Sequence, residues 1–155
     1  MDKVLFRGIE LSWDDYYWLG ESCQPSEIEI HINSKDEQPQ SPHNLQIHAW
    51  DEFLNNYDSI LSSILNEILK YYIRMRPRYL EAGSEWVENM PEINNTKEIE
   101  KIITLNYITI NWPYDEMRVQ IGLSYSCTWE REHGLGVVLE NNIVKEVGGA
   151  DCAII

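Results

Sequence analysis

The sequence predicts an α+β fold in which an antiparallel β-sheet packs against one long amphipathic helix, with a short helix beside it. Two observations support this prediction. Apolar residues recur every three or four positions across residues 50–75, which is the spacing of a single helical face. The segments on either side alternate apolar and polar residues, as strands with one buried face do. With 155 residues, the chain is expected to form one domain, 1–155, around one sizeable core.

The first forty residues are expected to form an N-terminal antiparallel meander. A short apolar run indicates a strand at 4–6, and alternating residues indicate strands at 9–13 and 27–32. Gly8 marks a bend between the first two. An aromatic cluster at residues 16–18 follows, and Gly20 is expected to end the strand there. This part of the chain therefore supplies one half of the predicted sheet.

The strand at 27–32 places three isoleucines on one face and three titratable residues on the other. The titratable residues are Glu27, Glu29 and His31. A zinc ion would require three or four N, O or S ligands converging at about 2 Å, and the chain has no His-x-x-x-His, Cys-x-x-Cys or calcium-loop spacing. We interpret this face as a solvated acidic surface, and we expect no metal site and no cofactor.

The long helix follows a polar, proline-containing loop at residues 34–44. It is expected to begin between Leu45 and Trp50, with Asn44 as its cap. Pro77 is expected to end it, because proline disfavours helical geometry at the preceding residue.

The last third of the chain is expected to form a short helix and a four-stranded meander. The short helix runs from Thr96, its cap, to about Ile103. A strand follows near residues 108–112, and the clearest strand then runs from 117 to 129, with a bulge expected near Gly122. The long helix is expected to lie across the inward row of that strand. The residues of this row are Met117, Val119, Ile121, Leu123 and Trp129.

The last two strands are expected to form a hairpin. The pair Asn141-Asn142 can adopt the positive φ angles of a tight turn, and a strand is predicted on each side of it.

The net charge of -14 limits the classes of partner. The acidic excess lies in the parts predicted as β, with a balance of -6 in residues 1–43 and -7 in residues 83–155. Such a surface repels a phosphate backbone, so we expect no direct nucleic-acid binding. It suits a basic partner protein, although acidity that only maintains solubility is the simpler alternative.

The cysteines and the apolar runs bear on the compartment. Cys23, Cys127 and Cys152 form no pair with ligand-like spacing, and an odd, sparse set favours a reducing cytoplasm. The charged start is unlike a signal peptide, and no apolar run reaches the length of a membrane span. We therefore expect a cytoplasmic protein without membrane contact.

The segment from Cys127 to Gly136, with sequence CTWEREHGLG, is the most distinctive stretch of the chain. It resembles a Trp-acid-x-Glu-His-Gly-Leu-Gly signature of small uncharacterised bacterial domains. The resemblance covers about residues 45–151. It implies β-hairpins with one amphipathic helix and a likeness to toxin-immunity proteins. No enzymatic activity is established for the resembled family.

Four residues of this segment are candidates for binding: Trp129, Glu130, Glu132 and His133. Trp129 ends the inward row and is expected in the core. Glu132 and His133 fall at the turn into the next strand, where a carboxylate and an imidazole could fix the corner without any ligand. A catalytic alternative makes His133 a general base oriented by Glu132, but neighbouring residues on a regular strand point to opposite faces. A metal held by His133 with Glu130 is a further alternative, for which the ligand set is too small.

We therefore expect a non-catalytic binding protein, most specifically an immunity-type inhibitor of a basic bacterial toxin. The alternative is a small hydrolase or metal-dependent enzyme that uses His133 and Glu132.

Overall fold

The computed structural model describes residues 3–83 and 87–153, and in this part of the chain one open sheet contains eight strands. The strands lie side by side in chain order, and all neighbours are antiparallel except the fourth and fifth. The strands are β1 (Lys3–Phe6), β2 (Ile9–Trp13), β3 (Tyr17–Ser22), β4 (Ile28–Asn33), β5 (Ile103–Ile110), β6 (Gln120–Cys127), β7 (Leu135–Glu140) and β8 (Ile143–Gly148).

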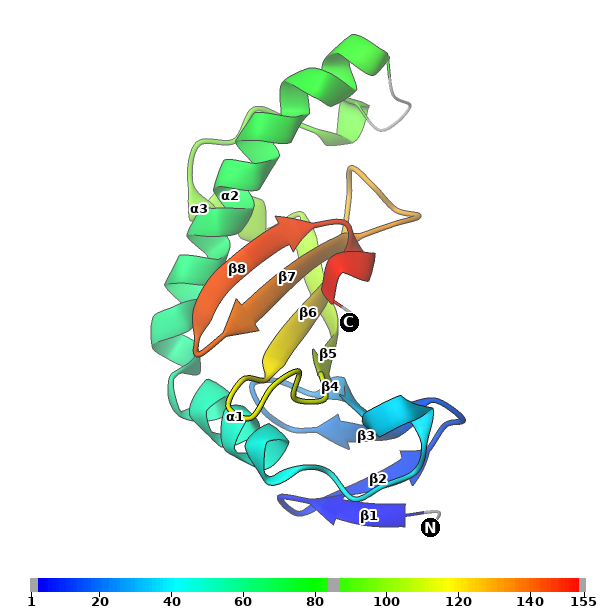
Figure 1. Cartoon of the computed structure of the whole chain (residues 1–155). Coiled ribbons are helices and arrows are strands. Elements are labelled where there is room, and N and C mark those ends of the chain that lie inside the picture. The colour runs from blue at the N-terminus through cyan, green and yellow to red at the C-terminus, as the bar shows by residue number, and fades with distance from the viewer. Residues whose placement is uncertain (1–2, 84–86, 154–155) are drawn as a thin grey trace.

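The helices lie almost entirely in the connection from β4 to β5. Figure 1 shows the two longer helices running along one side of the strongly twisted sheet. The α-helices are α1 (Asn44–Asn55), α2 (Tyr57–Ala82) and α3 (Thr96–Glu100), and the 3-10 helices are η1 (Lys35–Glu37), η2 (Val87–Asn89) and η3 (Ala150–Ala153). The α+β class predicted from the sequence is confirmed.

The sheet is wider than the two separate meanders that the sequence predicted. Residues Glu29–Ile32 of β4 pair in parallel with Tyr107–Ile110 of β5, and this pairing joins the two halves. Parallel neighbours need a long crossover, and the helical connection provides it. Ile30 and Ile108 are both fully buried on the shared inner face, so the pairing also makes one core continuous.

The predicted long helix is two helices that meet at Asn56, whose φ of -113° and ψ of 7° are not helical. The cap of α1 is His43 rather than Asn44. The His43 ring accepts a hydrogen bond from the Leu45 N–H at 3.0 Å, and Gln46 accepts one from the His43 N–H at 2.9 Å. These reciprocal bonds satisfy two donors that a helix start leaves open.

Pro77 does not end the helix, contrary to the prediction. The helix α2 continues to Ala82 and ends at Gly83, whose φ of 63° is the usual left-handed cap. Pro77 lies on the exposed side, next to the exposed Ile73 whose carbonyl it leaves without a helical partner. Water can bind that carbonyl, which reduces the cost of the proline.

The short helix and the long strand are both shorter than predicted. Asn95, not Thr96, caps α3 by accepting from the Glu98 N–H at 3.0 Å, and Ile103 already belongs to β5. Strand β6 begins at Gln120, so Met117 lies in the preceding loop with 81% of its surface exposed rather than in the inward row.

The other predicted inward positions are buried as expected. Val119, Ile121 and Leu123 belong to the same hydrophobic core as the buried face of α2. Trp129 is only 2% exposed, and its ring meets Tyr72 of α2 edge to face at a centroid distance of 4.9 Å. The core thus links the distal half of α2 to the end of β6.

The expected bulge near Gly122 lies elsewhere. The pairing of β5 with β6 shifts between Leu105 and Tyr107, while the register through Gly122 is regular. Gly122 is needed for another reason, because a Cβ there would lie 2.0 Å from the carbonyl oxygen of Ala153. The segment η3 therefore packs directly on the backbone of β6.

Candidate functional site

The β6–β7 corner contains the four residues singled out from the sequence. Glu130 occupies its centre, with its side chain 19% exposed. One carboxylate oxygen faces the N–H and the Nδ1 atom of His133 at 3.4 and 3.3 Å, and the other accepts from the Tyr79 hydroxyl at 3.4 Å. Glu130 therefore connects the corner to α2, and it is Glu130 rather than Glu132 that contacts the imidazole.

Backbone contacts close the same corner. The Gly134 N–H donates to the Glu130 carbonyl, and the His133 carbonyl accepts from the Ala150 N–H, both at 3.0 Å. Gly134 has a φ of 64°, and a Cβ there would lie 2.6 Å from the carbonyl oxygen of Tyr125. The glycine of the motif is thus required both by its conformation and by its close approach to β6.

Burial keeps the reactive groups around Glu130 protonated. The pKa of Tyr79 is raised to about 12, first by burial and then by the charge of Glu130. The pKa of the Cys127 thiol is raised to about 11, again mainly by burial. A nucleophilic cysteine requires a lowered pKa, so the Cys127 environment is that of a core residue.

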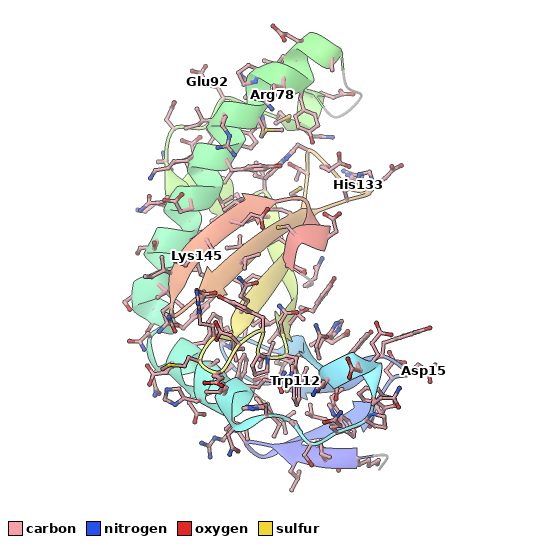
Figure 2. All side chains as sticks on the ribbon, in the orientation of Figure 1. Asp15, Arg78, Glu92, Trp112, His133 and Lys145 are labelled. Atoms are coloured by element: carbon pink, nitrogen blue, oxygen red, sulfur yellow. The ribbon has the colours of Figure 1, made fainter. Side chains whose placement is uncertain are left out.

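Glu132 and His133 are both on the surface. The His133 side chain is 74% exposed, and Figure 2 shows it at the outer tip of the β6–β7 loop. Among the described residues, Glu132 makes no side-chain hydrogen bond or ion pair, so the structure does not bring these two together as a dyad. Their exposure leaves both accessible to a partner, whereas Trp129 is enclosed in the core.

No group of three or more His, Cys, Asp or Glu side chains that could hold a metal ion occurs in residues 3–83 and 87–153. Of the three candidate ligands on the strand at 27–32, His31 and Glu29 contact each other, with His31 Nε2 at 2.5 Å from Glu29 Oε1, and Glu27 contacts neither. Within the same ranges, no helix is both long and apolar enough to cross a membrane.

A second surface stands out on the outer face of β3, β4 and β5. His31 lies between Tyr17 and Tyr107, with both ring centroids 4.4 Å from its own and the planes tilted by only 14° and 13°. The three rings come from three adjacent strands. Stacked aromatic rings of this kind form a rigid, amphipathic platform. Burial and the nearby Asp14 raise the pKa of Tyr17, so its hydroxyl remains a hydrogen-bond donor at neutral pH.

A row of three glutamates borders this platform. We call Glu21, Glu27 and Glu29 the acidic row; they line a hollow of about 470 Å³ together with Cys23. Glu21 and Glu29 lie directly opposite each other in the pairing of β3 with β4, where like charges repel. Residues 8–34 contain no lysine or arginine at all. Among the described residues, neither Glu21 nor Glu27 forms an ion pair or a side-chain hydrogen bond.

The sequence pattern identified one face of β4 but not this platform. Alternation placed Glu27, Glu29 and His31 together, but the neighbours of His31 depend on which strands pair with β4 and in which register. Tyr107 arrives through the parallel pairing with β5, about seventy-six positions further along the chain. The residues near β4 in the sequence give no indication of this pairing.

The family model of a domain of unknown function, DUF6985, matches residues 6–154. No curated protein and no solved structure matches the chain. The expected relation to an uncharacterised domain family is confirmed, while the Trp-acid-x-Glu-His-Gly-Leu-Gly signature and the likeness to immunity proteins stay predictions. Since the match spans nearly the whole sequence, this chain belongs to the DUF6985 family of domains of unknown function.

Proposed function

We propose that this protein is a non-catalytic binding protein that captures a basic partner protein on the outer face of β3 and β4. The most specific form of the proposal is an immunity-type inhibitor of a basic bacterial toxin. The observation that carries it is the acidic row Glu21, Glu27 and Glu29, where no described lysine or arginine pairs with a carboxylate and only His31 contacts Glu29. Basic side chains of a partner would relieve the repulsion between Glu21 and Glu29.

The platform beside the acidic row supports the same function. Tyrosine is among the residues that contribute most binding energy at protein interfaces, because it buries a ring and still offers a hydroxyl. Tyr17 and Tyr107 are held in place by stacking on His31, and Tyr16 at the neighbouring turn is largely exposed. A partner would therefore meet ordered aromatic rings next to carboxylates.

The exposed residues of the β6–β7 corner are a separate candidate contact. Glu132 and His133 project from the loop tip, so a partner could reach them, while Glu130 is engaged by His133 and Tyr79. We expect their contribution to be smaller than that of the acidic row, because a single exposed pair contributes about 0–1 kcal/mol.

The experiment measures the affinity of this protein for a basic toxin encoded beside its gene, with two variants of equal charge. The first carries Glu21→Gln, Glu27→Gln and Glu29→Gln, and the second changes three exposed glutamates elsewhere. The control positions are Glu81, Glu92 and Glu116. Each variant has a formal charge of -11, since three of the charges in -14 are removed.

The first variant is expected to bind at least about tenfold more weakly, which corresponds to about 1.4 kcal/mol. The control variant is expected to lose much less, and the affinity of the unchanged protein is expected to fall with added salt. Equal losses in both variants would show that only overall charge matters. A failure to bind any toxin encoded nearby would contradict the immunity role.

A further inference from the structure

A crevice opens on the opposite face of the sheet from the acidic row. It lies between α1 and the part of the sheet where β6 begins and β7 ends, far from the β6–β7 corner along both strands. The helix buries Gln46, Trp50 and Phe53 on one face. A second set at helical spacing points toward the crevice: Leu45, His48, Ala49 and Glu52. Val119, Ile121 and Leu139 lie across from it, and the cavity between them measures about 230 Å³.

The inner surface of this crevice is apolar and already ordered. Val119, Ile121 and Leu139 belong to the core, and Ala49 is too small to fill the space above them. Met117 stands exposed at the opening instead of covering it. An apolar cavity of about 150 Å³ is enough to hold benzene, so this crevice has room for an aromatic ring or a branched aliphatic group.

The rim of the crevice offers hydrogen-bond acceptors and a negative charge. It contains Glu52, His48 and the turn residues Asn141 and Asn142, and none of the described lysines or arginines lines it. Glu52 makes no side-chain hydrogen bond or ion pair with the described residues. Its neighbour Asp51, in contrast, already binds Arg7 through bonds of 2.6 and 3.1 Å.

The turn at the rim is held in a fixed shape. Asn141 and Asn142 have φ angles of 51° and 63°, which asparagine tolerates better than most residues and which define a tight hairpin turn. These angles fix the shape of the turn at the edge of the crevice. A rigid apolar floor with a carboxylate at its edge selects a particular ligand chemistry.

We propose that this crevice is a binding site for an amphipathic organic amine. Its aromatic or branched apolar group lies against Val119 and Leu139, and its ammonium group faces Glu52. The site is independent of the proposed function, because the acidic row lies on the outer face of the sheet and Ile121 lies on the inner face.

The experiment titrates 2-phenylethylammonium into the ¹⁵N-labelled full chain and follows backbone amide shifts. Two probes with the same ring serve as controls: neutral 2-phenylethanol and anionic 3-phenylpropanoate. Shifts are expected at Ala49, Val119 and Leu139, with the affinity falling from the cation to the neutral probe to the anion. Glu52→Gln is expected to lower the affinity for the cation by about twofold to fivefold and to leave the affinity for the neutral probe unchanged.

A larger side chain at Ala49 tests whether the probes bind in this crevice. Ala49→Leu keeps a good helix former and places a branched side chain in the cavity, so it is expected to abolish the shifts of all three probes. Ala82→Leu, an identical change on the exposed end of α2, is expected to leave them intact. If Ala49→Leu does not fold, Ala49→Met provides the same block with a more adaptable side chain.

Equal binding of the cation and the anion would overturn the proposal. So would shifts that persist in a folded Ala49 variant, or cation shifts confined to Glu21, Glu27 and Glu29. None of these results would affect the proposed capture of a basic protein, because that proposal is measured with a different ligand and different variants.

Discussion

The β6–β7 corner and the acidic row both contain several carboxylates, but they differ in how many of these carboxylates have partners within the chain. At the corner, Glu130 is surrounded by partners from α2 and from its own loop. In the row, Glu21 and Glu29 face each other across two strands, and among the described residues only Glu29 has a side-chain partner, His31. Carboxylates that have partners inside the chain stabilise its own structure, and carboxylates left without them remain available to another molecule. The contrast supports the interpretation that the CTWEREHGLG segment acts mainly as a structural corner.

The largest expected effect comes from the indole that anchors this corner. Trp129→Ala should reduce the free energy of unfolding by about 3–5 kcal/mol, because it removes a buried ring that packs on Tyr72. Urea unfolding monitored by circular dichroism measures the change. Tyr16→Ala, an exposed aromatic at the turn that leads into β3, should stay within about 0.5 kcal/mol of the unchanged protein. Similar effects of both substitutions would remove the contrast between the two regions.

The next effect separates backbone conformation from close packing. Gly134 and Gly83 have nearly equal φ angles of 64° and 63°, but only Gly134 has neighbours where a Cβ would go. Gly83→Ala should cost about 1–2 kcal/mol for the left-handed conformation alone. Gly134→Ala should cost more, since its Cβ would lie 2.6 Å from the carbonyl oxygen of Tyr125. Equal losses in thermal unfolding would show that the corner is looser than the structure indicates.

A smaller effect tests which carboxylate of the motif is engaged. Glu130→Gln should cost about 0.5–1.5 kcal/mol, because an amide replaces the charge that faces His133 and Tyr79. Glu132→Gln should change stability by less than about 0.5 kcal/mol, since its side chain has no partner among the described residues. Denaturant unfolding of the two variants side by side provides the comparison. A larger loss at Glu132 would reverse the assignment.

Local patterns predicted the elements whose structure depends on neighbours in sequence. The alternation at residues 9–13 and 27–32, the apolar stripe of the helices and the turn at Asn141-Asn142 all appear as expected. The core position of Trp129 followed from the same alternation. These predictions succeeded because period and turn chemistry act over a few residues.

The features that the sequence did not predict depend on distant parts of the chain. Apolar residues continue at helical spacing on both sides of Asn56, so this pattern does not predict the break between α1 and α2. The platform around His31 requires the parallel pairing of β4 with β5, and the exposure of Met117 depends on where β6 begins. The choice of Glu130 over Glu132 depends on how the loop returns toward α2.

The smallest expected energy is also the most direct test of the acidic row. A double-mutant cycle with Glu21→Gln and Glu29→Gln measures the coupling between the two carboxylates in the free protein. The coupling should be repulsive by about 0.2–1 kcal/mol at low salt, so that Glu21→Gln, which removes no contact among the described residues, stabilises the fold, and the coupling should decrease as salt screens the charges. A coupling of zero, or an attractive one, would mean that the row is already neutralised and is not held open for a basic partner.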